Sequence, residues 1–155
     1  MKVIDAAAAA LKLGAVDETG AMAEDSFTLA GDVRLLPRDI RSLQLGKAAI
    51  AAGIDTLLDA AGLRPSDVDG FLIAGGFGSR LNVESAAAIG LIPALLASRA
   101  RALGNAALTG AARMLLDRSE QERGSELAQI ARHVDLGGNP AFNQHFMDRM
   151  LFPEQ

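Results

Sequence analysis

Three glycines within four residues directly follow a short apolar run, and they are the first candidates for a ligand site. The run spans Phe71 to Ala74, and the next four residues are Gly75, Gly76, Phe77 and Gly78. Glycine lets a backbone approach a ligand closely and expose N–H groups to an anion. The spacing is neither a G-x-G-x-x-G fingerprint, whose third glycine would fall at Leu81, nor a P-loop, because no Gly-Lys-Ser/Thr follows. A tight turn between a strand and a helix explains the pattern about as well.

Gln44 and Lys47 are the second candidates, on a long helix predicted over Arg38 to Ala61. At about 100° per residue the apolar residues of this helix define one arc, namely Ile40, Leu43, Ile50, Ala51, Ile54, Leu57 and Leu58. Lys47 falls inside that arc and Gln44 at its edge. A lysine placed there either extends past the rim to solvent or neutralises a bound anion such as a nucleotide. Extension to solvent is the more common outcome.

A third candidate is the segment Gly104 to Ala112, in which Asn105 precedes a run of small residues. Ala106 and Gly110 lie one helical turn apart, so this helix has a side with almost no side-chain bulk. Such a side suits very close contact with a sheet, or with a ligand at the helix N-terminus. Core packing is the default explanation.

Composition excludes several classes of function. The chain has no Cys, so disulfides, thiolate zinc sites and iron–sulfur ligation are ruled out within it, and a reducing cytoplasm fits. The net charge of −4 argues against nucleic acid as a partner, and no apolar run is long enough for a membrane span. His133 and His145 are too isolated for a metal site, and no residue stands out as catalytic.

The elements that would position these residues alternate between strands and helices, which predicts an α/β fold. Pro37 and Gly62 delimit the long helix, and Asn82 caps another. The strand Phe71 to Ala74 is wholly apolar, so we expect burial on both of its faces. The remaining predicted elements are a helix over Ile4 to Ala15, a hairpin over Ser26 to Leu36, helices over Val83 to Ile89, Asn105 to Asp117 and Gln121 to Arg132, a strand over His133 to Leu136, and a helix over Ala141 to Leu151.

Four segments in this order resemble the carboxy-terminal domain of the reductive activators of corrinoid proteins. They are "DIRSLQLGKAAIAAGI", "FLIAGGFGSRLNVESAAAIGLIP", "GNAALTGAA" and "NPAFNQHFMDRMLFP". The resemblance covers nearly the whole chain, and the combination is specific although each motif alone is not. It implies the superfamily of actin, heat-shock chaperones and sugar kinases, which bind ATP between two ribonuclease-H-like subdomains. The expected fold is one such subdomain, a mixed sheet with flanking helices, incomplete at its amino-terminal side.

The resemblance also implies roles for the candidate residues. Gly75 and Gly76, with Phe77 and Gly78 after them, match the adenosine motif near the sugar and α-phosphate. Gln44 and Lys47 match helix positions that carry Glu and Lys against the adenosine in the chaperones, so Gln replaces the acid here. The segment that begins Gly104-Asn105 resembles the chaperones' D-E-A-V-A-Y-G-A-A, with Gly104 at the acidic position. The implied cofactor is ATP with Mg, in the full-length protein.

As a whole, the resemblance predicts that residues 1–155 are the carboxy-terminal ATPase-type subdomain of a larger activator. A ferredoxin-like [2Fe–2S] domain upstream would supply an electron, and a corrinoid protein would be the partner that ATP helps return from Co(II) to Co(I). ATPase activity is expected only in the full-length protein. The alternatives are a non-catalytic interaction module of the same fold and half of a small-molecule kinase, and a homodimer remains open.

Two expectations concern the site directly. Lys47 should point into the same cleft as Gly75 and Gly76 and away from bulk solvent. The chain alone should bind ATP weakly or not at all, because only the adenosine side of the site can be matched in it.

Overall fold

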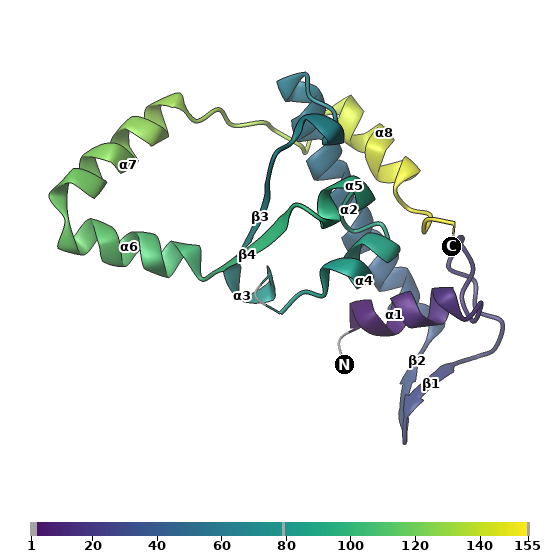
Figure 1. The fold of residues 1–155 in the computed structure, drawn as a ribbon. Coiled ribbons are helices and arrows are strands. Elements are labelled where there is room, and N and C mark those ends of the chain that lie inside the picture. Colours follow the sequence, from purple (N-terminus) through teal and green to yellow (C-terminus); the bar gives the residue numbers. More distant parts are fainter. Residues whose placement is uncertain (1–2, 79, 155) are drawn as a thin grey trace.

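Helix α2 (Pro37–Ala61) runs through the centre of the computed structural model, which describes residues 3–78 and 80–154 (Figure 1). Pro37 occupies its first turn, where a missing N–H costs nothing, and Asp39 accepts a hydrogen bond from the Leu36 N–H at 3.0 Å. Gly62 ends the helix in the left-handed conformation, with φ 66°. The predicted limits of this helix are therefore confirmed to within a residue.

The core lies along one side of α2, beneath α1 (Val3–Lys12), the hairpin β1 (Phe27–Ala30) and β2 (Val33–Leu35), and α4 (Val83–Ala88). The hairpin is antiparallel as predicted, and Asn82 caps α4 by accepting from the Ser85 N–H at 3.0 Å. The buried apolar cluster is composed of Ile4, Ala7, Ala10, Leu11, Val16, Leu35, Ile40, Ala86, Ile89, Leu91, Ile92 and Phe152.

Strands β3 (Phe71–Ala74) and β4 (Ala100–Gly104) form a separate parallel pair. The connection between them contains α3 (Gly75–Gly78), α4 and α5 (Ala94–Ala97), and a short 3-10 helix, η1 (Pro65–Asp67), precedes β3. The α/β class is confirmed, with parallel and antiparallel strands divided between two two-stranded sheets in the described residues.

The prediction that β3 is buried on both faces is wrong. Its residues alternate between half-buried and exposed, and Leu72 is 59% exposed. The reason is that the sheet has only two strands here, so one face has no covering layer in the described part of the chain. Strand β4 was not predicted from the sequence, because its residues include an arginine and a glycine and lack the β-branched side chains that mark strands.

Helices α6 (Ala106–Leu116) and α7 (Arg118–Ile130) extend away from α2 as an arm, and residues 131–139 lead back to α8 (Pro140–Asp148), which packs on α2 (Figure 1). The predicted strand His133 to Leu136 is wrong, since residues 131–136 are irregular and no neighbouring strand pairs with them in the described chain. Helix α7 begins three residues before its predicted start, because Asp117 accepts from the Ser119 N–H at 2.9 Å and caps it. Among the described helices, none has both the length and the apolar character needed to cross a bilayer.

Candidate functional site

The glycine-rich segments after β3 and β4 lie side by side at the carboxyl edge of the parallel pair. Ala74 at the end of β3 is in register with Gly104 at the end of β4. Gly75 has φ 93° and Gly104 has φ 66°, which is the left-handed region that glycine adopts at low cost. The predicted turn after β3 is confirmed, and it takes the form of the single helical turn α3. Two segments that the sequence marked independently therefore meet at one edge.

This edge leaves open space above its glycines. A Cβ atom added to Gly75, Gly76 or Gly104 would meet nothing within 4 Å beyond its own chain neighbours. Asn105 caps α6 by accepting from the Leu108 N–H at 3.1 Å, so the N-terminal end of that helix, with its partial positive charge, also faces this edge. Phe77 and Gly78 continue the turn, but the Phe77 side chain lies outside the described part.

The chemistry available at the edge is recognition. Carboxyl ends of parallel strands are where open α/β sheets bind ligands, and glycines there allow a ligand to approach the backbone closely. Gly75, Gly76, Gly104 and Asn105 carry no titratable side chain, so they can bind and orient but cannot transfer a proton. An apolar cavity of about 210 Å³ adjoins the edge, because Ala74 is part of its wall together with Ile73, Leu81 and Ile92.

Gln44 lies elsewhere, on the face of α2 that contacts the end of the chain. Its side-chain amide donates to the Thr19 carbonyl at 2.9 Å and to the Met150 carbonyl at 3.2 Å, while its oxygen accepts from Arg41 at 3.0 Å. Gly20 is required beside it, since a Cβ there would lie 2.5 Å from the Gln44 amide oxygen. The hydrogen-bonding groups of Gln44 are thus used within the fold.

Lys47 is buried on the same face, with only 1% of the residue exposed. Its Nζ donates to the Leu151 carbonyl and lies 5.0 Å from the centre of the Phe152 ring, a cation–π contact. Burial, together with repulsion from the Arg149 charge, lowers the pKa of Lys47 from 10.5 to about 8. The prediction that Lys47 avoids bulk solvent is confirmed.

One ion pair and one histidine–carboxylate contact continue this contact surface along α2. Arg149 donates two hydrogen bonds to Asp55, at 2.6 and 3.1 Å, and His145 lies 2.7 Å from Asp59. We call the set Gln44, Lys47, Asp55 and Asp59, with the segment His145–Phe152 that they hold, the C-terminal clasp. This clasp was not predicted from the sequence. A helical wheel contains the signal, because these four polar positions fall within about 120° of one another on the helix.

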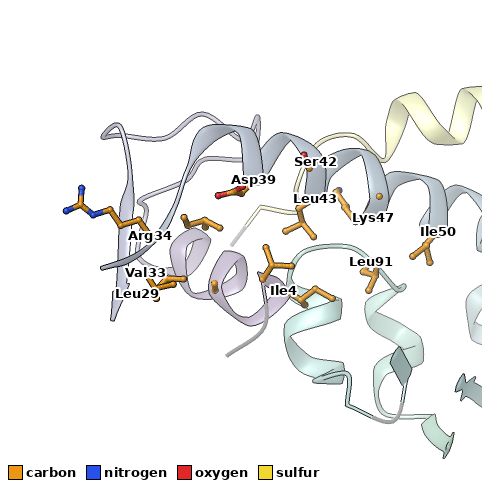
Figure 2. A pocket seen from close by; sticks show the side chains of 14 residues that line it. Ile4, Leu29, Val33, Arg34, Asp39, Ser42, Leu43, Lys47, Ile50 and Leu91 are labelled. Carbon is orange, nitrogen blue, oxygen red and sulfur yellow. The ribbon is translucent and has the colours of Figure 1, made fainter. Parts of the chain in front are cut away.

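A larger groove of about 560 Å³ lies between α1, the hairpin and α2, and Figure 2 shows its lining residues. Its walls are mostly apolar, with Ile4, Leu43 and Leu91 among them, and Lys47 also contributes. Neither Gly75 nor Gly76 lines this groove, so the expected cleft shared by Lys47 and the glycines is not seen. The side of α6 that has almost no side-chain bulk does not pack closely against a sheet, since a Cβ added to Gly110 would meet nothing within 4 Å.

Comparison with known proteins gives the family of the chain and a solved structure with the same fold. The family model described as the C-terminal domain of RACo, the ASKHA domain, matches residues 2–155. The chain belongs to this family. A solved structure, a reductive activator for a corrinoid, iron–sulfur protein, matches this RACo-type domain with a TM-score of 0.85 and 30% identity, over 98% of the chain and 28% of the solved one.

Two curated relatives carry related descriptions. The corrinoid activation enzyme RamQ of Eubacterium limosum is 35% identical over 121 residues, which are 78% of this chain and 20% of the relative. A "[Co(II) methylated amine-specific corrinoid protein] reductase" of Methanosarcina barkeri is 24% identical over 152 residues, which are 97% of this chain and 28% of the relative. The RACo-type domain described here therefore spans only a fifth to just over a quarter of the relatives it matches.

Proposed function

We propose that this chain is the adenosine-side part of an ATP-dependent reductive activator of corrinoid proteins. The single observation that carries the proposal is the meeting of the two glycine-rich strand ends, Gly75-Gly76 and Gly104-Asn105, at the carboxyl edge of β3 and β4. The named relatives act on corrinoid proteins, which favours the activator over a small-molecule kinase. An interaction module without nucleotide would not need an open glycine-lined edge.

The described residues fit one side of a nucleotide. Glycines with open space above them allow close approach of a sugar and α-phosphate, and the neighbouring apolar cavity suits a flat base. Hydrolysis of a bound ATP to ADP and phosphate would supply free energy, and its Mg²⁺ would need oxygen ligands. His, Asp and Glu side chains do not gather into groups of three or more around a metal position in the described residues. In this proposal the phosphate and metal side of the site is assigned to other parts of a larger protein.

Gln44 and Lys47 receive a different role in this proposal. Their polar groups already bind main-chain carbonyls of residues 19, 150 and 151, and a buried lysine held this way is poorly placed to contact a nucleotide. We therefore assign nucleotide contact to Gly75, Gly76, Gly104 and Asn105, and assign Gln44 and Lys47 to the C-terminal clasp. The proposal also includes a cytoplasmic setting and, as the resemblance implies, an upstream [2Fe–2S] domain, since this chain itself offers no Cys to hold a cluster.

Calorimetric titration with Mg-ATP tests the assignment in two proteins. One is the 155-residue chain, where we expect weak or undetectable binding. The other is a chimera in which this chain replaces the matched 28% of the solved reductive activator. In the chimera Gly76→Val should weaken binding at least about tenfold, because a β-branched side chain fills the space a nucleotide needs.

The matched control is Gly70→Val, at the opposite end of the same strand. A Cβ atom added to Gly70 would meet nothing within 4 Å, and its φ is not left-handed, so this change should leave affinity unaltered. Micromolar binding by the isolated chain, or equal losses in both variants, would show that the nucleotide lies elsewhere. Reduction of the activator's corrinoid partner by the chimera, and its loss in Gly76→Val, would extend the test to function.

A further inference from the structure

The cavity that adjoins the glycine-lined edge has walls of one chemical kind. It lies between helix α2, strand β3 and the connection that follows α3, and its volume is about 210 Å³. Among the described residues that line it, none has a hydrogen-bonding side chain. They are Ile50, Ile54, Phe71, Leu72, Ile73, Ala74, Leu81, Leu91 and Ile92. A ligand held there meets aliphatic side chains and a single aromatic ring.

The volume and the openings of this cavity limit what it can hold. Pockets for drug-sized ligands enclose roughly 300–1,000 Å³, so a cavity of about 210 Å³ takes a ring system and not a whole nucleotide. At one end Ala74 joins it to the edge formed by Gly75 and Gly104. Ile50 and Leu72, which are 48% and 59% exposed, bring it to solvent. A flat base can therefore lie in the cavity with its sugar at the glycines and part of its rim in water.

The apolar walls decide which part of a base is recognised. Burying an amino or carbonyl group without a hydrogen-bond partner is costly, so the polar rim of the base stays at the solvent side, beside Ile50 and Leu72. Water satisfies an amino group and a carbonyl group equally well there. The faces of the rings, in contrast, gain dispersion and hydrophobic contact from Ile54, Ile73 and Leu81. The side chains of the cavity thus distinguish ring systems by size and shape, and they offer no hydrogen bond that separates adenine from hypoxanthine.

We propose that this cavity recognises a purine by its ring system and not by its hydrogen-bonding edge. The inference rests on the proposed function, because it takes the ligand at the glycine edge to be a nucleotide. An apolar pocket rejects a near-isosteric ligand by about a hundredfold at most, whereas a site built to hydrogen-bond the ligand reaches about ten-thousandfold. Adenosine and inosine should therefore bind within about tenfold of each other. Cytidine, whose single ring buries less apolar surface, should bind several times more weakly than either.

Methyl-detected NMR titration of the 155-residue chain with the three nucleosides tests the cavity without any phosphate. The methyl groups of Ile54, Ile73 and Ile92 should shift with adenosine and with inosine. Those of Ile4 on α1 and Ile130 on α7 do not line the cavity and should not move. No shift at the cavity methyls would overturn the proposal. So would a preference for adenosine over inosine greater than about tenfold, or cytidine binding as tightly as adenosine.

A substitution that fills the cavity ties these shifts to its walls. Ile54→Phe should weaken adenosine and inosine by the same factor, at least about tenfold, because the larger side chain takes the space of the base. Leu57→Phe, at a 54% exposed leucine of the same helix that does not line the cavity, is the control and should change neither affinity. If circular dichroism shows that Ile54→Phe does not fold, Ile50→Phe at the half-exposed wall replaces it. Unchanged affinities in the filled variant would overturn the assignment of the base to this cavity.

Titration of the chimera with Mg-ATP and Mg-ITP separates recognition of the base from the proposed function. If neither nucleotide binds the chimera while the nucleosides still shift the cavity methyls, the proposed function fails and purine recognition stands. If Mg-ATP binds more than about tenfold tighter than Mg-ITP, the proposed function stands and recognition by the ring system alone fails. Affinities within about tenfold of each other support both.

Discussion

Replacing Lys47 with Met should change how the stability of the fold depends on pH. The Lys47 ammonium lies against the Leu151 carbonyl and the Phe152 ring, and its burial, together with repulsion from Arg149, lowers its pKa from 10.5 to about 8. An unfolded chain keeps this proton until the pH approaches 10.5, whereas the folded chain releases it near pH 8. Between these values the unfolded state binds more protons, so stability rises with pH. Below pH 8 both states are protonated and the cost of burying the charge is constant.

The size of the effect follows from the pKa difference. At about 1.4 kcal/mol per pH unit, the interval from about 8 to 10.5 corresponds to about 3 kcal/mol. A domain of this size is stable by only about 5–15 kcal/mol, so the change is large enough to measure. Met fills a similar volume and carries no charge, and therefore the variant lacks this pH dependence.

Urea unfolding followed by circular dichroism, at several pH values from about 7 to 10.5, is the assay. The free energy of unfolding of the wild type, minus that of Lys47→Met, should rise by up to about 3 kcal/mol across the interval. Lys12→Met, at an exposed lysine of α1, is the control and should give a flat difference. If the difference for Lys47→Met does not change with pH, the wild-type Lys47 ammonium is solvated. If the difference falls as the pH rises, a negative group stabilises that ammonium. Either result would refute the reasoning.

Three further changes test the clasp and the caps by urea unfolding at neutral pH. Arg149→Met should cost about 1–3 kcal/mol because it leaves the nearly buried Asp55 carboxylate without its two hydrogen bonds, whereas Arg118→Met on the exposed arm should cost little. Gly20→Ala should cost at least about 2 kcal/mol, since the new methyl group overlaps the Gln44 amide and φ is 82°; an unchanged midpoint would place Gln44 elsewhere. Asn139→Ala removes the cap that accepts from the Ala141 N–H at 2.9 Å and should cost about 1 kcal/mol, and no loss would mean that α8 needs no cap.

The sequence by itself determined the elements whose signals lie within a few residues. Pro37 and Gly62 define the ends of α2 because a fixed φ and a left-handed cap act locally. The helix cap Asn82 and the glycines after β3 are local signals of the same kind. The alternation of apolar and polar residues in the hairpin is another. The resemblance carried by the four quoted segments was confirmed by the family match, because a combination of motifs in order is specific where each alone is not.

Tertiary structure alone decided the partners of the polar residues and the existence of some strands. Lys47 binds the carbonyl of Leu151, 104 residues away, and nothing near Lys47 in the sequence distinguishes a carbonyl from a nucleotide. Strand β4 exists because β3 pairs with it, whereas His133 to Leu136 has strand-like residues and no strand beside it in the described chain. A helix cap is satisfied by its own neighbours, but a strand or a buried charge is stable only where distant parts of the chain supply the hydrogen bonds.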